Sequence, residues 1–159
     1  MLLALSLIIF ILEAQLPPLA PIPGIKMGLS NVITLVTLVW YGRRDAFLQL
    51  MLRITLGSIF AGQAVSFLYS MSGGLLCFFV MALLLKPIGN DKLWVISVFG
   101  AIAHNAGQII AAVIILSSWA AAAYFPILVV SAVITGAFTG LLATCVMKNK
   151  YLEYLVKNK

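Results

Sequence analysis

Charged residues are scarce in this sequence, and acidic residues are the scarcest. Only 9% of the 159 residues are charged, 64% are hydrophobic, and the mean hydropathy is +1.16. Soluble domains carry about 25% charged residues, so this chain has too little charge to cover a soluble globule. We therefore expect an integral membrane protein. We interpret the net charge of +6 as a signal of membrane orientation and expect no nucleic-acid partner.

Groups that hold metals are equally scarce. Magnesium bound to a diphosphate needs clustered oxygen ligands, and no Asp-Asp-x-x-Asp cluster occurs. The two cysteines lie in apolar runs and form no metal or disulfide pattern, so we expect them to pack like small hydrophobic residues. We expect no metal, no cofactor and no catalytic residue in this chain. The four acids are separated from one another in the sequence: Glu13, Asp45, Asp91 and Glu153.

Long apolar runs fill most of the chain. Only helices or closed barrels satisfy the backbone in lipid, and these runs lack the strict alternation of strands. We predict an all-α, polytopic membrane domain of six transmembrane helices over residues 1–147, followed by a basic cytoplasmic tail at 148–159. The first span is short for a crossing. The predicted spans are approximately 1–16, 27–41, 46–62, 65–85, 93–116 and 124–147.

Basic residues are distributed unequally between the connectors of these spans. Lys26 is the only one on one side, and Arg53 lies inside a span. Because basic connectors remain in the cytoplasm, the other eight predict that both termini are cytoplasmic. Those eight are Arg43, Arg44, Lys86, Lys92, Lys148, Lys150, Lys157 and Lys159.

The connector at residues 13–30 contains four of the six prolines. Proline removes amide donors and restricts the preceding residue, so this segment cannot be one continuous helix. It is nevertheless apolar, and irregular backbone at membrane depth is tolerated only against protein or a cavity. Two interpretations follow: a lid or re-entrant segment over the outer mouth of the bundle, or a stiff surface connector.

Polar side chains interrupt the apolar run at 93–116. His104 and Gln108 are four residues apart and share a helix face, while Asn105 reaches Gln108 at a spacing of three. Lipid cannot satisfy these groups, so they face other helices or a cavity and mark a candidate functional site. The alternatives are ligand binding and an interhelical hydrogen-bond clamp.

Arg53 lies well inside the third span, with Gln49 one turn earlier on the same face. A central arginine costs at least about 2.5 kcal/mol on insertion scales, so its retention suggests a partner. That partner is either an anionic ligand, which arginine can bind in a bidentate fork, or a structural group such as Glu13 or free backbone carbonyls.

Three more candidates flank these helices. Lys26 and Asn31 lie at the entry to the second span, where Lys26 either binds ligand or extends toward the membrane interface. In the fourth span, the stretch from Ser70 to Gly74 either breaks the helix or precedes a helix that starts at Gly73, and Tyr69 beside it could cap a ligand. In the sixth span, the Gly136–Gly140 pair predicts close packing against another helix of the bundle.

Four segments together resemble a known family. They are Pro23–Asn31, Arg53–Gly57, Phe67–Gly74 and Gly100–Gln108, and the resemblance extends from Glu13 to about Ala112. In order and spacing they resemble heptaprenyl diphosphate synthase component I, also called the Gx transporter family. These are small integral membrane proteins of bacteria, similar in size and span count to the substrate-binding S-components of energy-coupling-factor transporters. The resemblance implies an S-component-like bundle in the bacterial plasma membrane.

Three functional hypotheses follow. The first is a transport or substrate-binding subunit for a small, anionic organic molecule, partnered with an energy-coupling module. The second is a non-catalytic membrane component of heptaprenyl diphosphate synthase, partnered with a soluble prenyl synthase subunit in polyprenyl or menaquinone side-chain synthesis. The third is a membrane component of an extracellular electron-transfer system. The candidate substrate-binding residues are Arg53, His104, Asn105, Gln108, Lys26, Asn31, Tyr69 and Gln49.

Overall fold

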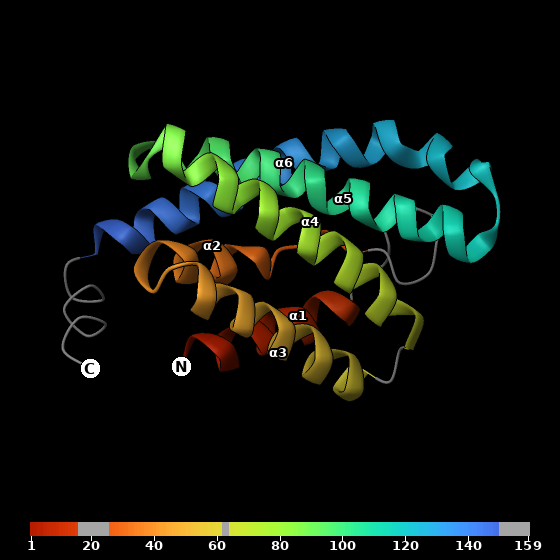
Figure 1. Cartoon of the computed structure of the whole chain (residues 1–159), viewed down its shortest axis with the longest axis horizontal. Helices are drawn as coiled ribbons and strands as arrows, with labels where there is room; N and C mark the ends of the chain where they lie inside the picture. Colours follow the sequence, from red (N-terminus) through yellow and green to blue (C-terminus); the bar gives the residue numbers. More distant parts are fainter. Residues whose placement is uncertain (16–25, 62–63, 150–159) are drawn as a thin grey trace.

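The computed structural model describes residues 1–15, 26–61 and 64–149 (Figure 1). These residues form helices and no strand, so the prediction of an all-α fold is confirmed. Two short 3₁₀ helices, η1 (Asn90–Lys92) and η2 (Trp119–Tyr124), precede the last two long helices. The six α-helices are α1 (Leu2–Gln15), α2 (Asn31–Trp40), α3 (Arg43–Ala61), α4 (Ala64–Ile88), α5 (Leu93–Leu116) and α6 (Phe125–Lys148).

Three segments are long and apolar enough to cross a membrane: Val65–Ile88, Asn90–Leu116 and Trp119–Lys148. They indicate a membrane protein. The helices α1 and α2 are apolar but shorter, and the ten residues of α2 rise only about 15 Å along its axis. Six crossings of the bilayer therefore remain a prediction.

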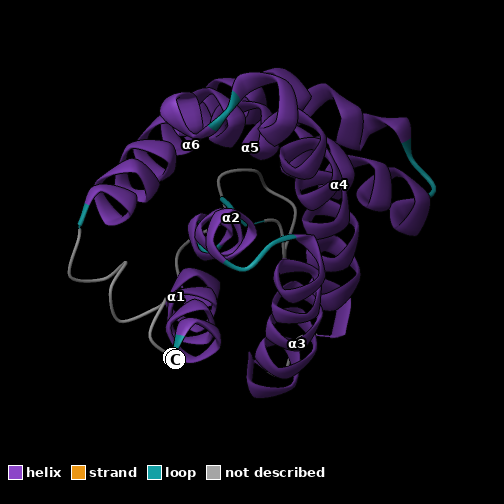
Figure 2. Cartoon of the chain, turned by 60° about the vertical axis from the view of Figure 1, so that its left-hand side comes forward, coloured by secondary structure: helices purple, strands orange, loops and turns teal. Residues whose placement is uncertain are grey.

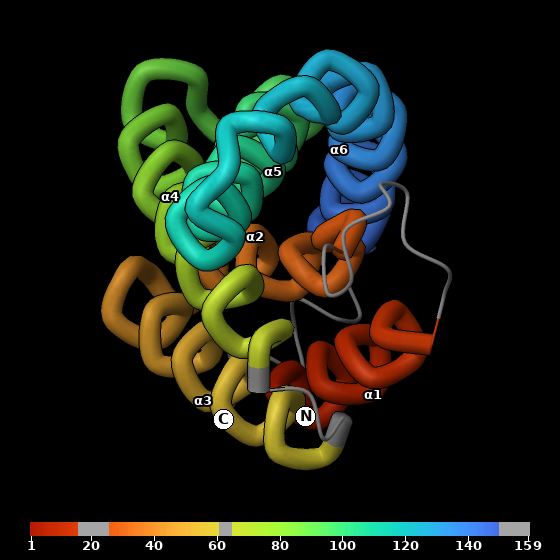
Figure 3. Tube along the Cα trace, turned by 90° about the vertical axis from the view of Figure 1, so that its right-hand side faces the viewer, coloured from red at the N-terminus to blue at the C-terminus, as the bar shows by residue number. Residues whose placement is uncertain are grey.

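The short helix α2 lies at the centre of the bundle. Figures 2 and 3 show it enclosed by α4, α5 and α6 on one side and by α1 and α3 on the other. Eight of its ten residues are buried, from Asn31 to Leu38. Its apolar side chains form the main core with Leu50 and Ile54 of α3 and Met81 of α4. Seven of its ten residues are apolar, as expected for a buried helix, and its buried Thr34 and Thr37 hydroxyls are hydrogen-bonded.

The long helices α4, α5 and α6 pack closely because small residues line their contacts. A Cβ atom at Gly107 of α5 would lie 2.6 Å from the backbone oxygen of Ser72 in α4. One at Gly136 of α6 would lie 2.7 Å from Val98 Cα in α5, and one at Gly140 would lie 2.4 Å from Trp94 Cα. The prediction that the Gly136–Gly140 pair packs within the bundle is confirmed.

The predicted break in the fourth helix is wrong. The helix α4 runs without interruption from Ala64 to Ile88, through the whole Ser70–Gly74 stretch. The two glycines there have a packing role instead. A Cβ atom at Gly73 would lie 2.7 Å from the His104 backbone oxygen, and one at Gly74 would lie 2.8 Å from Ile54. Glycine at these positions allows α5 and α3 to approach α4.

One end of the bundle collects the basic connectors. The ends of α2, α4 and α6 lie there together with the starts of α1, α3 and α5, on the left of Figure 1. Arg43 and Arg44 begin α3, Lys86 lies in the last turn of α4, Lys92 precedes α5, and Lys148 ends α6. The predicted gathering of basic residues at one side is thus present, while its cytoplasmic orientation remains a prediction. Lys150, Lys157 and Lys159 lie outside the described residues.

Two further predictions meet the structure only in part. The Pro-rich stretch of the first connector falls at residues 16–25, outside the described residues, so the lid interpretation rests on Lys26 to Ser30 alone. Both cysteines are free, and Cys77 is buried in the core as expected. Cys145 is instead exposed on α6, among apolar side chains that face outward.

Candidate functional site

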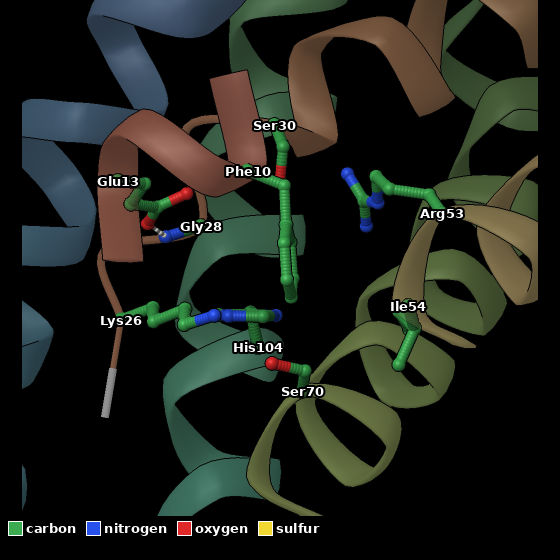
Figure 4. Close-up of a pocket in the computed structure, with 9 residues that line it drawn as sticks. All are labelled: Phe10, Glu13, Lys26, Gly28, Ser30, Arg53, Ile54, Ser70 and His104. Atoms are coloured by element: carbon green, nitrogen blue, oxygen red, sulfur yellow. Dashed lines mark hydrogen bonds between the residues drawn. The ribbon is translucent and has the colours of Figure 1, made fainter. Parts of the chain in front are cut away.

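A pocket lies where the connector before α2 meets α1, α3, α4 and α5 (Figure 4). Its enclosed volume is about 10 Å³. One buried water molecule needs about 10–15 Å³, so the pocket in this conformation has room for one water-sized group. It is lined by Phe10, Glu13, Lys26, Gly28, Ser30, Arg53, Ile54, Ser70 and His104.

The first helix contributes one buried face to this pocket. Ser6, Phe10 and Glu13 are the buried residues of α1, and their spacings of four and three place them on one side of the helix. The Phe10 ring lies against α3 because Gly57 has no side chain there: a Cβ atom would lie 2.4 Å from Phe10 Cδ1. In Figure 4 this ring stands in the middle of the pocket, with Lys26 and Arg53 pointing toward it from opposite sides.

Lys26 enters from the connector and is 8% exposed. Its ammonium group lies 3.6 Å from the centroid of the Phe10 ring, a cation–π contact. The nitrogen Nζ has no hydrogen-bond partner among the described residues. Burial lowers the pKa of Lys26 to about 8, and the nearby charge of Glu13 opposes part of this shift.

Two hydrogen bonds hold the connector beside the pocket. The backbone N–H of Lys26 donates to Gln108 Oε1 at 3.3 Å, and the backbone N–H of Gly28 donates to Glu13 Oε1. Gly28 has φ +80°, and a Cβ atom there would lie 2.9 Å from His104 Cδ2. Both its backbone conformation and the close approach of the imidazole require glycine.

Arg53 is almost completely buried, at 2% exposure. Its Nη2 donates to Asn31 Oδ1 at 2.9 Å, which ties α3 to the start of α2. Its Nε and Nη1 have no hydrogen-bond partner within the described part of the chain. The carboxylate of Glu13 bonds to the backbone of Gly28 and makes no hydrogen bond to Arg53. The proposed structural bridge between Arg53 and Glu13 is therefore not formed as a hydrogen-bonded pair.

The polar residues of α5 divide between the pocket and the neighbouring helix. Gln108 accepts from the Lys26 backbone through Oε1, so its Nε2 faces the imidazole and donates to His104 Nε2 at 3.0 Å. The remaining ring proton of a neutral His104 then lies on Nδ1. Gln108 thus fixes both the connector and the tautomer of the pocket histidine.

Three predicted site residues lie outside the pocket. Asn105 donates through Nδ2 to the Leu128 backbone oxygen of α6 at 2.7 Å, which matches the interhelical-clamp alternative. Gln49 donates to Ser6 Oγ at 2.6 Å and accepts from Thr34 Oγ1 at 3.2 Å, joining α1, α2 and α3. Tyr69 is 1% exposed within a second apolar cluster.

The structure therefore brings together five of the eight candidates. Lys26, Arg53 and His104 line the pocket, while Asn31 and Gln108 bond to them. Sequence reasoning missed Phe10, Ser30, Ile54 and Ser70 as lining residues. It considered Glu13 only as a partner for Arg53. The spacing of Ser6, Phe10 and Glu13 carried a signal, because a polar residue at each end of one apolar face suggests a buried face.

The charges at the pocket suit an anion. Lys26 and Arg53 supply two positive charges against one carboxylate, so the pocket is positive overall when all three are ionised. Ser70 Oγ, a further lining group, also has no hydrogen-bond partner among the residues described. No group of three or more His, Cys, Asp or Glu side chains that could hold a metal occurs in the described ranges. The donors present are those that bind carboxylate or phosphate.

Comparison with known proteins gives one match. No curated protein and no solved structure matches the chain significantly. The model of one protein family, described as heptaprenyl diphosphate synthase component I, matches residues 2–146. This range includes all six helices except the last two residues of α6. The chain therefore belongs to the heptaprenyl diphosphate synthase component I family.

Proposed function

We propose that this protein is a membrane subunit that binds a small organic anion in the pocket formed by Arg53, Lys26 and Ser70. The main observation behind the proposal is that buried hydrogen-bond donors at the pocket lack partners. Arg53 Nε and Nη1, Lys26 Nζ and Ser70 Oγ are buried and without hydrogen-bond partners in the described residues. A buried donor left unpaired costs about 1–3 kcal/mol, more if it is charged. An anionic group placed among them would recover that cost.

The rest of the pocket would position the anion. Asn31 holds one side of the guanidinium, which leaves its other nitrogens directed at the ligand. Phe10 and Ile54 supply apolar walls. Since the pocket in this conformation has room for one water-sized group, we propose that its side chains move apart to admit a carboxylate or phosphate while the remainder of the ligand extends through the opening. His104, held by Gln108, would hydrogen-bond to the ligand at the α5 side.

The transport role rests on this binding site. In the proposed arrangement six helices cross the plasma membrane with both termini in the cytoplasm, as in an S-component, and residues 148–159 form the basic tail. The pocket would then receive its anion from outside, beneath the connector that carries Lys26. Asn105, Gln49 and Tyr69 remain proposed site residues, and their observed contacts suggest that they act by holding the helices around the pocket.

Direct binding measurements test the site. The purified full-length protein in detergent would be titrated with sodium sulfate and with sodium benzoate, a tetrahedral and a planar anion. We expect Arg53→Gln to weaken binding at least tenfold. Arg44→Gln is the matched control, because Arg44 lies on the same helix and is exposed; its affinity should equal that of the wild type. Equal affinities in wild type and Arg53→Gln would refute the site.

The family match favours a second candidate function. As a non-catalytic membrane component of heptaprenyl diphosphate synthase, the protein would bind a soluble synthase subunit. The basic end of the bundle is the proposed contact, since Arg44, Lys86 and Lys92 are exposed there. Arg43 is less suitable because it already donates to the Ala82 backbone oxygen at 2.9 Å.

Co-purification distinguishes this second function from anion binding. We expect a soluble prenyl synthase subunit to be retained by the wild type and by Arg53→Gln, and to be lost when Arg44, Lys86 and Lys92 are replaced together by glutamine. Retention by the triple variant would refute the proposed contact surface. Loss with Arg53→Gln alone would instead connect the partner to the pocket.

A further inference from the structure

We propose that anion binding in this pocket is coupled to the uptake of one proton, and that Glu13 receives it. The inference rests on the proposed anion site and adds a coupling ion to it. Its starting point is a carboxylate that faces the same small space as the two cations and bonds to neither of them. A purely structural acid beside a buried arginine would be expected to pair with it.

The hydrogen bonding of Glu13 leaves one oxygen available for a proton. Oε1 accepts from the backbone N–H of Gly28, and Oε2 has no hydrogen-bond partner in the described ranges. Protonation at Oε2 keeps Oε1 as a carbonyl acceptor, so the bond to Gly28 persists in both protonation states. The connector that carries Lys26 therefore stays in place while the charge of the site changes.

The charge balance of the pocket supplies the coupling. Without a ligand, burial opposes the ionisation of Glu13, and the positive charges of Lys26 and Arg53 favour it. A bound anion brings a second negative charge into the same small pocket. The repulsion between two anionic groups in one small site favours protonation of one of them, although Lys26 and Arg53 offset part of this effect. The entering anion therefore raises the proton affinity of the carboxylate.

Other charged groups face the same space and must be separated from Glu13. Lys26 approaches from the connector, Arg53 from α3 and His104 from α5, while α4 contributes the neutral Ser70. Arginine keeps its proton over the relevant range. With a pKa of about 8, Lys26 is about nine-tenths protonated at pH 7 and more below it. Measurements between pH 5.5 and 7.0 therefore leave Glu13 and His104 as the groups to distinguish.

The test uses sulfate, which does not itself titrate between pH 5.5 and 7.0. Calorimetric titrations of the full-length protein in buffers of different ionisation enthalpy count the protons taken up per sulfate bound. We expect close to one proton in the wild type and a dissociation constant that rises toward tenfold per pH unit. Glu13→Gln keeps the acceptor for Gly28, and we expect it to bind sulfate with no proton uptake and no such pH dependence.

The outcomes separate this inference from the proposed function. If sulfate binding depends on Arg53 but takes up no proton in the wild type, the coupling is refuted and the anion site stands. Uptake that persists in Glu13→Gln and disappears in His104→Gln assigns the proton to His104 and refutes the role of Glu13. If sulfate does not bind, or binds equally to Arg53→Gln, both proposals fail. Thermal melting of each variant verifies that it is folded.

Discussion

Replacing Arg53 should stabilise the protein while removing its anion binding. The change we would make is Arg53→Met, which keeps an unbranched apolar stem and removes the guanidinium. In the structure this side chain is 2% exposed and has two donor nitrogens without partners in the described part of the chain. Removing two unpaired buried donors should gain about 2–6 kcal/mol.

Two losses oppose this gain. The hydrogen bond from Nη2 to Asn31 is lost. A hydrogen bond to a charged group usually contributes about 1.5–3 kcal/mol to stability. The attraction between the arginine and Glu13 is lost as well. We expect a net stabilisation of about 1–2 kcal/mol. For a chain of this size, each kcal/mol shifts the melting temperature by about 2–4 °C, so the expected rise is roughly 2–8 °C.

Intrinsic fluorescence of the three tryptophans provides the assay, in detergent and without added anion. Arg44→Met on the same helix is the control, and its melting temperature should equal that of the wild type. Sulfate at 10–100 times its dissociation constant should stabilise the wild type by about 1.4–2.7 kcal/mol and leave Arg53→Met unchanged. A lower melting temperature for Arg53→Met without anion would refute the reasoning, because it would mean that Arg53 is fully paired in the folded protein.

Three further predictions concern the connector, the clamp and the packing of α4 on α5. Raising the pH from 7 to 9 deprotonates Lys26, whose pKa is about 8, so the affinity for benzoate should fall by up to tenfold. The variant Lys26→Arg keeps its charge and should show no such decrease. An equal decrease in Lys26→Arg would assign the pH dependence to another group. Asn105→Leu removes the bond to α6 and should lower the melting temperature while leaving the sulfate dissociation constant within about twofold; a large loss of affinity would place Asn105 in the site. Gly107→Ala forces a Cβ atom against the α4 backbone and should lower the free energy of unfolding, measured by chemical denaturation, by about 1–3 kcal/mol. An unchanged denaturation midpoint would show that α4 and α5 can separate freely.

The sequence predicted helix positions better than it predicted helix continuity. Apolar runs fixed the range of α5, which is 93–116 in both the prediction and the structure. The prediction for the fourth span failed because Ser-Met-Ser-Gly-Gly has poor intrinsic helix propensity. In the folded chain, close contacts of Gly73 and Gly74 with α5 and α3 outweigh that local preference. Such contacts are made by residues distant in sequence, so a local pattern cannot reveal them.

The same distinction applies to the site: the sequence indicated which residues are unusual, but not which residues they contact. Arg53, His104 and Lys26 were recognisable because each is a polar group in an apolar setting. Whether a polar group points into the pocket or across to a neighbouring helix depends on packing: Asn105, adjacent to His104, contacts α6 instead. The spacing of Phe10 from Ser6 and Glu13 indicates a buried face of α1, but it does not indicate what the Phe10 ring contacts. Its role follows from Gly57 on another helix and from the ammonium group above its ring.

The distribution of charge explains why the pocket is better understood as a binding site than as a structural ion cluster. The chain has only ten basic and four acidic residues, yet two of the former and one of the latter meet in this one buried place. A cluster kept for stability would pair its charges, because an uncompensated buried charge is costly. Here Glu13 bonds to the backbone of Gly28, Lys26 lies over an aromatic ring, and Arg53 bonds to an amide. Each charge is held in position by a neutral group, and this arrangement leaves the cations free to bind an incoming anion.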